Sequence, residues 1–241
     1  MELSKRQEVI IKTLSSSTLK AFKYVETFDD DKYRIYRDSD DFLYFSMENK
    51  RIVELELEIT GRENNILKCL DNLNSLRLLK IYIGNTKEKI LRLNLKIESL
   101  HYLYIHIEEE IKISVDFQNL PNLYEFIIQG DDMKNQKINV ESIKNIKNLE
   151  HLEIVSIRLS QIPEYVKELD KLRNLILRNC GLKKISNYIL NNKTLEWLDL
   201  RGNNELMIDK ETRDFLYEKF SLFNPPNHYL YEDLNSPLKK I

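Results

Sequence analysis

The sequence predicts an α/β repeat fold: a curved right-handed coil with a parallel sheet on its concave side and a mixture of helices and extended segments on its convex side. Two observations carry this prediction. An apolar frame recurs along the chain, and a hydrophobic fraction of 42% excludes a disordered chain. The pattern divides the chain into an N-terminal cap (1–50), a repeat region (51–206) and a C-terminal capping helix with a tail (207–241).

The frame has apolar residues at positions 1, 4 and 6 and occurs seven times, with starts 24, 24, 23, 26, 23 and 23 residues apart. One such unit cannot bury its own apolar residues, so neighbouring units must stack with their strands in parallel. The seven occurrences are Ile52-Leu55-Leu57, Leu76-Leu79-Ile81, Leu100-Leu103-Ile105, Leu123-Phe126-Ile128, Leu149-Leu152-Ile154, Leu172-Leu175-Leu177 and Leu195-Leu198-Leu200.

Two stretches carry a resemblance to a known family. Residues 172–182 fit the pattern L-x-x-L-x-L-x-x-N/C-x-L throughout, and residues 195–203 fit it to the asparagine. They resemble leucine-rich repeats, and residues 161–169 resemble the returning segment of the intracellular class of roughly 23 residues per repeat. The resemblance covers about residues 50–206. It implies a leucine-rich repeat solenoid and a binding role, without naming a partner, because the family has many unrelated binding roles.

Position 9 of the frame departs from the family pattern in most repeats. In the family, an asparagine or cysteine there satisfies backbone groups in the turn that leaves the strand. Regular curvature is therefore not expected through the first five repeats. The seven residues at this position are Thr60, Gly84, Glu108, Asp131, Ile157, Cys180 and Asn203.

The segments that return between strands show two patterns. Residues 90–97 and 111–117 alternate apolar with polar side chains, which predicts extended segments on the convex side. Short helices are expected after repeats 1, 5 and 6, at residues 65–72, 164–169 and 186–191.

Both ends of the repeat region need caps, because the terminal repeats would otherwise expose apolar residues. At the N-terminus we expect a helix beginning at residues 4–7, a second helical stretch carrying Leu19, Phe22 and Val25, and a hairpin of 33–36 with 42–47 that enters repeat 1 through residues 49–50. At the C-terminus, Asp209 can cap a helix to about residue 220 that turns Phe215, Leu216 and Phe220 toward the last repeat.

Composition restricts the class of partner and the compartment. Lys plus Arg (37) nearly balance Asp plus Glu (39), so the net charge of −2 gives no general attraction to nucleic acid or to an anionic membrane. Cys69 and Cys180 are too few for a disulfide framework, and the charged start does not resemble a secretion signal. We therefore expect a cytoplasmic location, and we expect neither nucleic acid nor a membrane as a partner.

No pattern typical of catalysis is present, and the five glycines never cluster into a phosphate-binding loop. We expect no enzyme activity, no cofactor and no small-molecule substrate. His101, His106 and His151 fall in predicted strands near the glutamates 108–110, so these residues are candidate metal ligands. No ligand spacing repeats, which favours a solvent-facing contact surface without a metal.

The candidate binding surface is the concave sheet, whose outward positions are 3, 5 and 7 of each frame. We place its centre at Tyr82, Tyr102, Tyr104 and His106, because exposed aromatic side chains are typical of binding hot spots. The alternative is that part of this cluster is cross-strand packing without a binding role. The full set is Glu56, Leu78, Tyr82, Tyr102, Tyr104, His106, Ile127, Gln129, Arg178, Trp197 and Arg201, with Glu56 and Arg178 as charged flanks.

Three functions remain open at this point. The favoured one is a non-enzymatic module that binds a protein or peptide through the concave sheet. The second is a recognition or regulatory subunit of a ligase, kinase, phosphatase or GTPase assembly whose catalysis lies in another chain. The third, a surface adhesin, requires an export signal that the sequence does not show.

Overall fold

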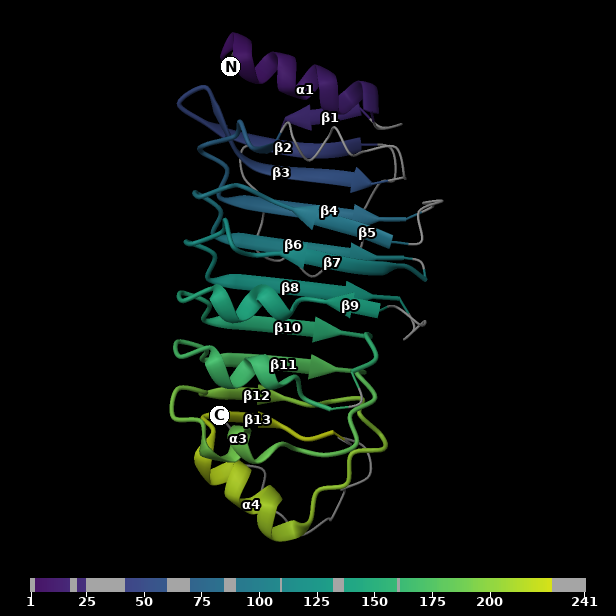
Figure 1. Cartoon of the computed structure of the whole chain (residues 1–241), viewed down its shortest axis with the longest axis vertical. Coiled ribbons are helices and arrows are strands. Elements are labelled where there is room, and N and C mark those ends of the chain that lie inside the picture. Colours follow the sequence, from purple (N-terminus) through teal and green to yellow (C-terminus); the bar gives the residue numbers. More distant parts are fainter. Residues whose placement is uncertain are drawn as a thin grey trace.

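The computed structural model describes residues 3–17, 21–24, 42–59, 70–84, 90–108, 110–131, 137–159 and 161–226. Its main feature is a ten-stranded sheet whose strands stack along the long axis of the molecule in the order β1-β2-β3-β4-β6-β8-β10-β11-β12-β13 (Figure 1). Every neighbouring pair in this sheet is parallel except β2 and β3. The ten strands are β1 (Ala21–Tyr24), β2 (Phe42–Glu48), β3 (Arg51–Ile59), β4 (Leu78–Ile83), β6 (Tyr102–Ile107), β8 (Glu125–Gly130), β10 (His151–Val155), β11 (Asn174–Arg178), β12 (Trp197–Asp199) and β13 (Leu222–Asn224).

The seven predicted frames lie in register in this sheet. Position 4 of each repeat pairs with position 4 of the next, and the side chains at this position are fully buried. The spacing of the apolar frame therefore predicted both the parallel pairing and the buried column, and both are confirmed. The column consists of Leu55, Leu79, Leu103, Phe126, Leu152, Leu175 and Leu198.

A second sheet of three parallel strands returns the chain in the N-terminal part of the stack. It consists of β5 (Ile90–Asn94), β7 (Lys112–Asp116) and β9 (Lys137–Asn139). The first two confirm the extended segments that the alternation predicted, whereas β9 was not predicted. The core lies between the two sheets, where the rings of Phe117 and Phe126 meet edge to face with centroids 4.9 Å apart.

Short helices return the chain in the C-terminal part. The 3₁₀ helix η3 (Glu164–Glu168) and the helix α3 (Asn187–Asn191) form where helices were predicted, and each buries one apolar residue, Val166 and Ile189. A further 3₁₀ helix, η2 (Glu141–Asn145), was not predicted. Most of the helix predicted for 65–72 lies outside the described residues.

At the N-terminal end, α1 (Lys5–Ser17) lies beyond β1 and buries Ile10 and Leu14 (Figure 1). The side chain of Gln7 is buried and accepts a hydrogen bond from the backbone N–H of Ile52 at 2.8 Å, which ties the helix to β3. The second helical stretch was a wrong prediction, because Phe22 lies in β1 opposite Leu43. The helical spacing of the three apolar residues was misleading, because residues 21–24 instead pair as a strand with the edge of β2.

A hairpin joins β2 to β3 through Asn49 and Lys50, which have φ values of 49° and 65°. Positive φ at both central residues is the requirement of the tight turns that suit a two-residue hairpin. The chain enters the first repeat at 49–50, as predicted, but the predicted pairing of 42–47 with 33–36 was wrong, because β2 lies between β1 and β3 in the sheet. The strand predicted at 33–36 lies outside the described residues.

At the C-terminal end, α4 (Lys210–Lys219) begins where Asp209 accepts a hydrogen bond from the N–H of Thr212, as predicted. Leu216 and Phe220 are buried, but Phe215 is 45% exposed, so its predicted orientation was wrong. The chain then adds β13, which was not predicted, beside β12. The tail from 227 to 241 lies outside the described residues.

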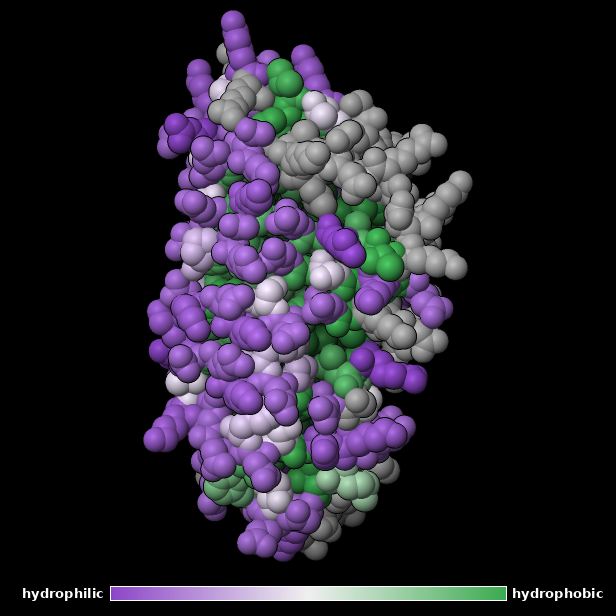
Figure 2. Space-filling model, viewed as in Figure 1, coloured by the Kyte–Doolittle hydropathy of each residue, from purple (hydrophilic) through white to green (hydrophobic). Residues whose placement is uncertain are grey.

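Hydrophilic side chains cover most of the surface in the view of Figure 2, and hydrophobic side chains show as a strip along the stack. None of the described helices has the length and apolar character needed to cross a membrane.

Candidate functional site: the open face of the large sheet

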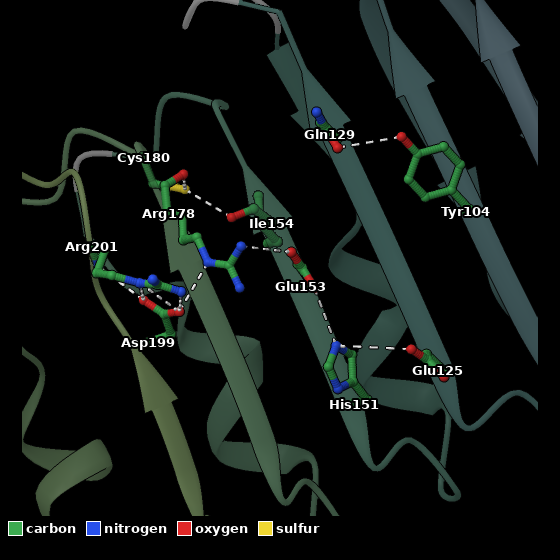
Figure 3. A network of polar contacts seen from close by, with 10 residues as sticks. All are labelled: Tyr104, Glu125, Gln129, His151, Glu153, Ile154, Arg178, Cys180, Asp199 and Arg201. Atoms are coloured by element: carbon green, nitrogen blue, oxygen red, sulfur yellow. Dashed lines mark hydrogen bonds and ion pairs between the residues drawn. The ribbon is translucent and has the colours of Figure 1, made fainter. Parts of the chain in front are cut away.

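The large sheet has one face on the core and one face that no described element covers. Side chains at positions 3, 5 and 7 of the frame lie on this second face, because side chains alternate along a strand and positions 4 and 6 are buried. We call it the open face. Figure 3 shows part of it, with polar side chains from β6, β8, β10, β11 and β12 rising from the same side of the ribbons.

Three aromatic rings from β4 and β6 form what we call the aromatic platform: Tyr82, Tyr104 and His106. The ring centroids are 6.0 Å apart for Tyr82–Tyr104, 6.1 Å for Tyr82–His106 and 6.4 Å for Tyr104–His106. The Tyr104 hydroxyl donates to Oε1 of Gln129 at 3.3 Å (Figure 3). The same hydroxyl lies 3.4 Å from Nδ1 of His106. All three rings are half-buried, so the strands hold them in place while part of each remains accessible.

Two predicted site residues lie beside the platform but are buried. Leu78 is 6% exposed and Tyr102 is 7% exposed, and the two face each other across β4 and β6. Tyr44, Tyr104 and Ile127 pack against this pair. The prediction that Tyr102 lies open to solvent was wrong, and for Leu78 and Tyr102 the alternative of cross-strand packing describes the structure. Tyr44 was missed because β2 lies outside the repeating frame.

Glu56 is not the exposed flank that the sequence predicted. It is 8% exposed, and its Oε1 lies 3.6 Å from Nζ of Lys80, which is 3% exposed. Lys80 was not among the predicted site residues. The signal for it was available, because opposite charges at position 5 of neighbouring repeats face each other across paired strands.

A second polar network occupies the C-terminal part of the open face (Figure 3). Asp199 is fully buried and accepts from Nε of Arg178 at 2.9 Å and from Arg201 Nη2 at 2.6 Å. Burial raises the pKa of Asp199, but the hydrogen bonds and charges of the two arginines outweigh burial, and its net pKa lies below the usual value. Arg178 also lies 3.7 Å from Glu153. The two predicted arginines are therefore held by a carboxylate that sequence reasoning did not select.

His151 and Trp197 lie in the same part of the face. Their rings meet edge to face at 6.4 Å, and Asn174, on the strand between them, lies 3.4 Å from Nδ1 of His151. Nε2 of His151 lies 3.5 Å from Glu153 and 4.0 Å from Glu125. Trp197 thus lies on the predicted face, packed against its neighbours.

The turn after β11 confirms the role expected at position 9. The Asn203 side chain is fully buried, accepts from the N–H groups of Cys180 and Leu182, and donates to the carbonyls of Leu177 and Leu200. The Cys180 thiol is buried and donates to carbonyl oxygens at 3.2 and 3.3 Å. Burial raises the pKa of this thiol to about 12, so it stays protonated and unreactive at neutral pH. Cys69 lies outside the described residues.

His101, His106 and His151, the three described histidines, belong to no cluster of metal-ligand type. Within the part of the chain that the structure describes, no group of three or more His, Cys, Asp or Glu side chains could hold a metal ion. Two depressions of about 410 and 520 Å³ lie on the other side of the molecule, where η2 meets η3 and where η3 meets α3. Their positions separate them from the open face.

No family model and no curated protein matches the chain. Among solved structures, the crystal structure of an internalin (InlF) from Listeria monocytogenes is similar to it, with a TM-score of 0.37 and 18% identity. The match covers 76% of this chain and 60% of that one. Likeness at this level says nothing about the function of this chain.

Proposed function

We propose that this chain is a non-enzymatic leucine-rich repeat module that binds a protein or peptide partner through the open face of its large sheet. In this proposal residues 51–206 form the solenoid, and residues 1–50 and 207–241 cap its two ends. The observation that carries the proposal is the aromatic platform, in which three half-buried rings are held on two rigid strands.

Two physical reasons support a binding role for the platform. A tyrosine has few rotatable bonds and offers both an apolar ring and a hydroxyl, so ordering it against a partner costs little conformational entropy. The hydrogen bond of Tyr104 to Gln129 and the ring contacts with Tyr82 restrict that entropy further before any partner arrives. Preorganisation of this kind raises affinity without adding contact area.

The test is a site-specific photo-cross-linker placed in the full-length protein in its native cells. One variant carries a benzophenone amino acid in place of Tyr104, and the matched variant carries it in place of Lys112, an exposed residue of β7 in the small sheet. We expect a discrete protein adduct from position 104 that disappears when Tyr82 is also changed to Ala. Adducts formed only from position 112 would contradict binding through the open face.

A further inference from the structure

The charges of the open face are unequal. At positions 3, 5 and 7 of the seven repeats, carboxylates outnumber cationic side chains by six to three. The chain as a whole is nearly neutral, with a net charge of −2, so this imbalance is a property of the face. The carboxylates are Glu54, Glu56, Glu58, Glu125, Glu153 and Asp199, and the cations are Lys80, Arg178 and Arg201.

Each of the three cations is held by a carboxylate of the same face. Lys80 lies 3.6 Å from Glu56, and both arginines lie within 3 Å of Asp199. Arg178 also lies 3.7 Å from Glu153, so three carboxylates lie beside the three cations, and these cations attract an anionic partner only weakly. The net field of the face is negative.

The negative charge lies on both sides of the aromatic platform. Glu58 on β3 is opposite Tyr82 in the register of β3 and β4. On the other side, Oδ1 of Asp131 lies 3.4 Å from Nε2 of His106. Carboxylates thus flank the aromatic rings of β4 and β6, and both kinds of group attract a cation. Aromatic faces bind an ammonium or guanidinium group that lies within about 6 Å of the ring centroid.

We propose that the N-terminal part of the open face recognises a basic segment of a partner protein, with an arginine side chain seated on Tyr82 and Tyr104. Arginine fits better than lysine because its guanidinium group is planar, stacks on aromatic rings and is more weakly hydrated. Glu58 on β3 and Asp131 after β8 lie on the two sides of this arginine and attract the neighbouring basic residues. This inference rests on the proposed function and adds the chemistry of the partner.

The experiment uses the full chain and three fluorescent peptides of one design, in which arginine, citrulline or glutamate alternates with glycine and serine. Citrulline keeps the shape of arginine and removes its charge. Fluorescence anisotropy should show binding of the arginine peptide that weakens at least tenfold with citrulline and falls with added salt. Equal binding of the citrulline peptide, preferred binding of the glutamate peptide, or no binding of the arginine peptide would overturn the proposal.

Variants of the protein locate the binding. Glu58→Lys should weaken binding of the arginine peptide about fivefold, and the double variant Tyr82→Leu with Tyr104→Leu should weaken it by at least as much. Tyr82→Phe keeps the ring, so its affinity should stay within about twofold of that of the parent protein. The matched control is Glu98→Lys, an exposed charge reversal outside the strands. An equal loss from Glu98→Lys and Glu58→Lys would overturn the site and leave only general charge attraction.

These outcomes are separable from those of the cross-linking test. If position 104 cross-links a partner but arginine peptides fail the tests above, the open face binds and the inference of a basic partner is wrong. If cross-links form only from position 112, the proposed function itself is wrong.

Discussion

The N-terminal and C-terminal repeats share one sheet but close their turns and return the chain differently. In the first repeats, the backbone N–H of position 9 bonds to the preceding strand, as Gly84 does to Ile59, Glu108 to Ile83 and Asp131 to Ile107. In the last repeats the side chain of Asn203 takes over this role with four buried hydrogen bonds. The segments that return the chain also differ between the two regions. The strands β5, β7 and β9 return it in the N-terminal repeats, and the helices η3 and α3 return it in the C-terminal repeats.

The difference between the two regions shows which position of the repeat the fold requires. The buried column at position 4 is complete in both regions, whereas the residue at position 9 varies in type and in burial. Stacking of apolar strands therefore sets the fold, and the asparagine is one of two ways to satisfy the turn. Polar backbone groups must be satisfied, but not by a particular side chain.

The largest effect expected from a single substitution is in the column. Leu175→Ala in the C-terminal region and Leu103→Ala in the N-terminal region should each reduce the free energy of unfolding by about 2 to 5 kcal/mol, because each leaves a cavity between two neighbouring strands. Urea denaturation measures both. A loss from Leu103→Ala below half of that from Leu175→Ala would show that the column does not act alike in the two regions.

Substitutions at position 9 test the difference between the two kinds of turn. Asn203→Ala removes the partner of two N–H groups and two carbonyls and should cost roughly 2 to 4 kcal/mol in unfolding free energy. Asp131→Ala, at the same position of repeat 4, should cost less than about 0.5 kcal/mol, because the backbone already makes the turn's bond there. Comparable losses from both variants would remove the distinction between the two kinds of turn.

The carboxylate of Asp199 predicts a pH dependence that belongs to the C-terminal region. Because the folded protein lowers its pKa, the stabilisation is complete above the ordinary value of 3.8 and is lost as pH falls through the folded pKa. Asp199→Asn should cost about 1 to 3 kcal/mol at pH 7 and flatten the stability curve in acid. Urea denaturation from pH 2 to pH 7 measures the unfolding free energy of the parent and the variant. If both show the same dependence on pH, Asp199 is not its cause.

The smallest effect concerns the thiol of Cys180. In a Cys69→Ser background, iodoacetamide should label Cys180 at neutral pH only after denaturation, because burial and the raised pKa keep it as a thiol. Mass spectrometry measures the labelled fraction. Rapid labelling of the folded protein would show that the turn after β11 opens readily.

Sequence periodicity predicted the repeats well, because an apolar residue at each position 4 has no other way to be buried. Alternation likewise predicted β5 and β7, where polar and apolar residues alternate from Leu91 to Asn94 and from Lys112 to Asp116. Periodicity failed for Phe22 and Phe215. These residues lie at the two ends of the stack, where burial depends on which element packs against the terminal strand. It also failed for Glu56 and Tyr102, which lie on the predicted face but are covered by neighbours on adjacent strands.

The candidate site was predictable only in part for the same reason. The frame identified which side chains share the open face, since that follows from parity along a strand. It could not show that Lys80 neutralises Glu56 or that Asp199 holds both arginines, because these are contacts between repeats. Tyr82, Tyr104 and His106 were already placed at the centre of the surface from the sequence, and the structure adds that Tyr102 beside them is buried.

The most direct test of binding through the open face compares two double variants for affinity toward the cross-linked partner once it is purified. Tyr82→Ala with Tyr104→Ala removes two rings of the platform, and Lys96→Ala with Lys112→Ala changes two exposed residues that accompany β5 and β7. Isothermal titration should show a loss of roughly 10- to 100-fold for the tyrosine pair and less than about twofold for the lysine pair. Equal losses, or a loss confined to the lysine pair, would contradict the account.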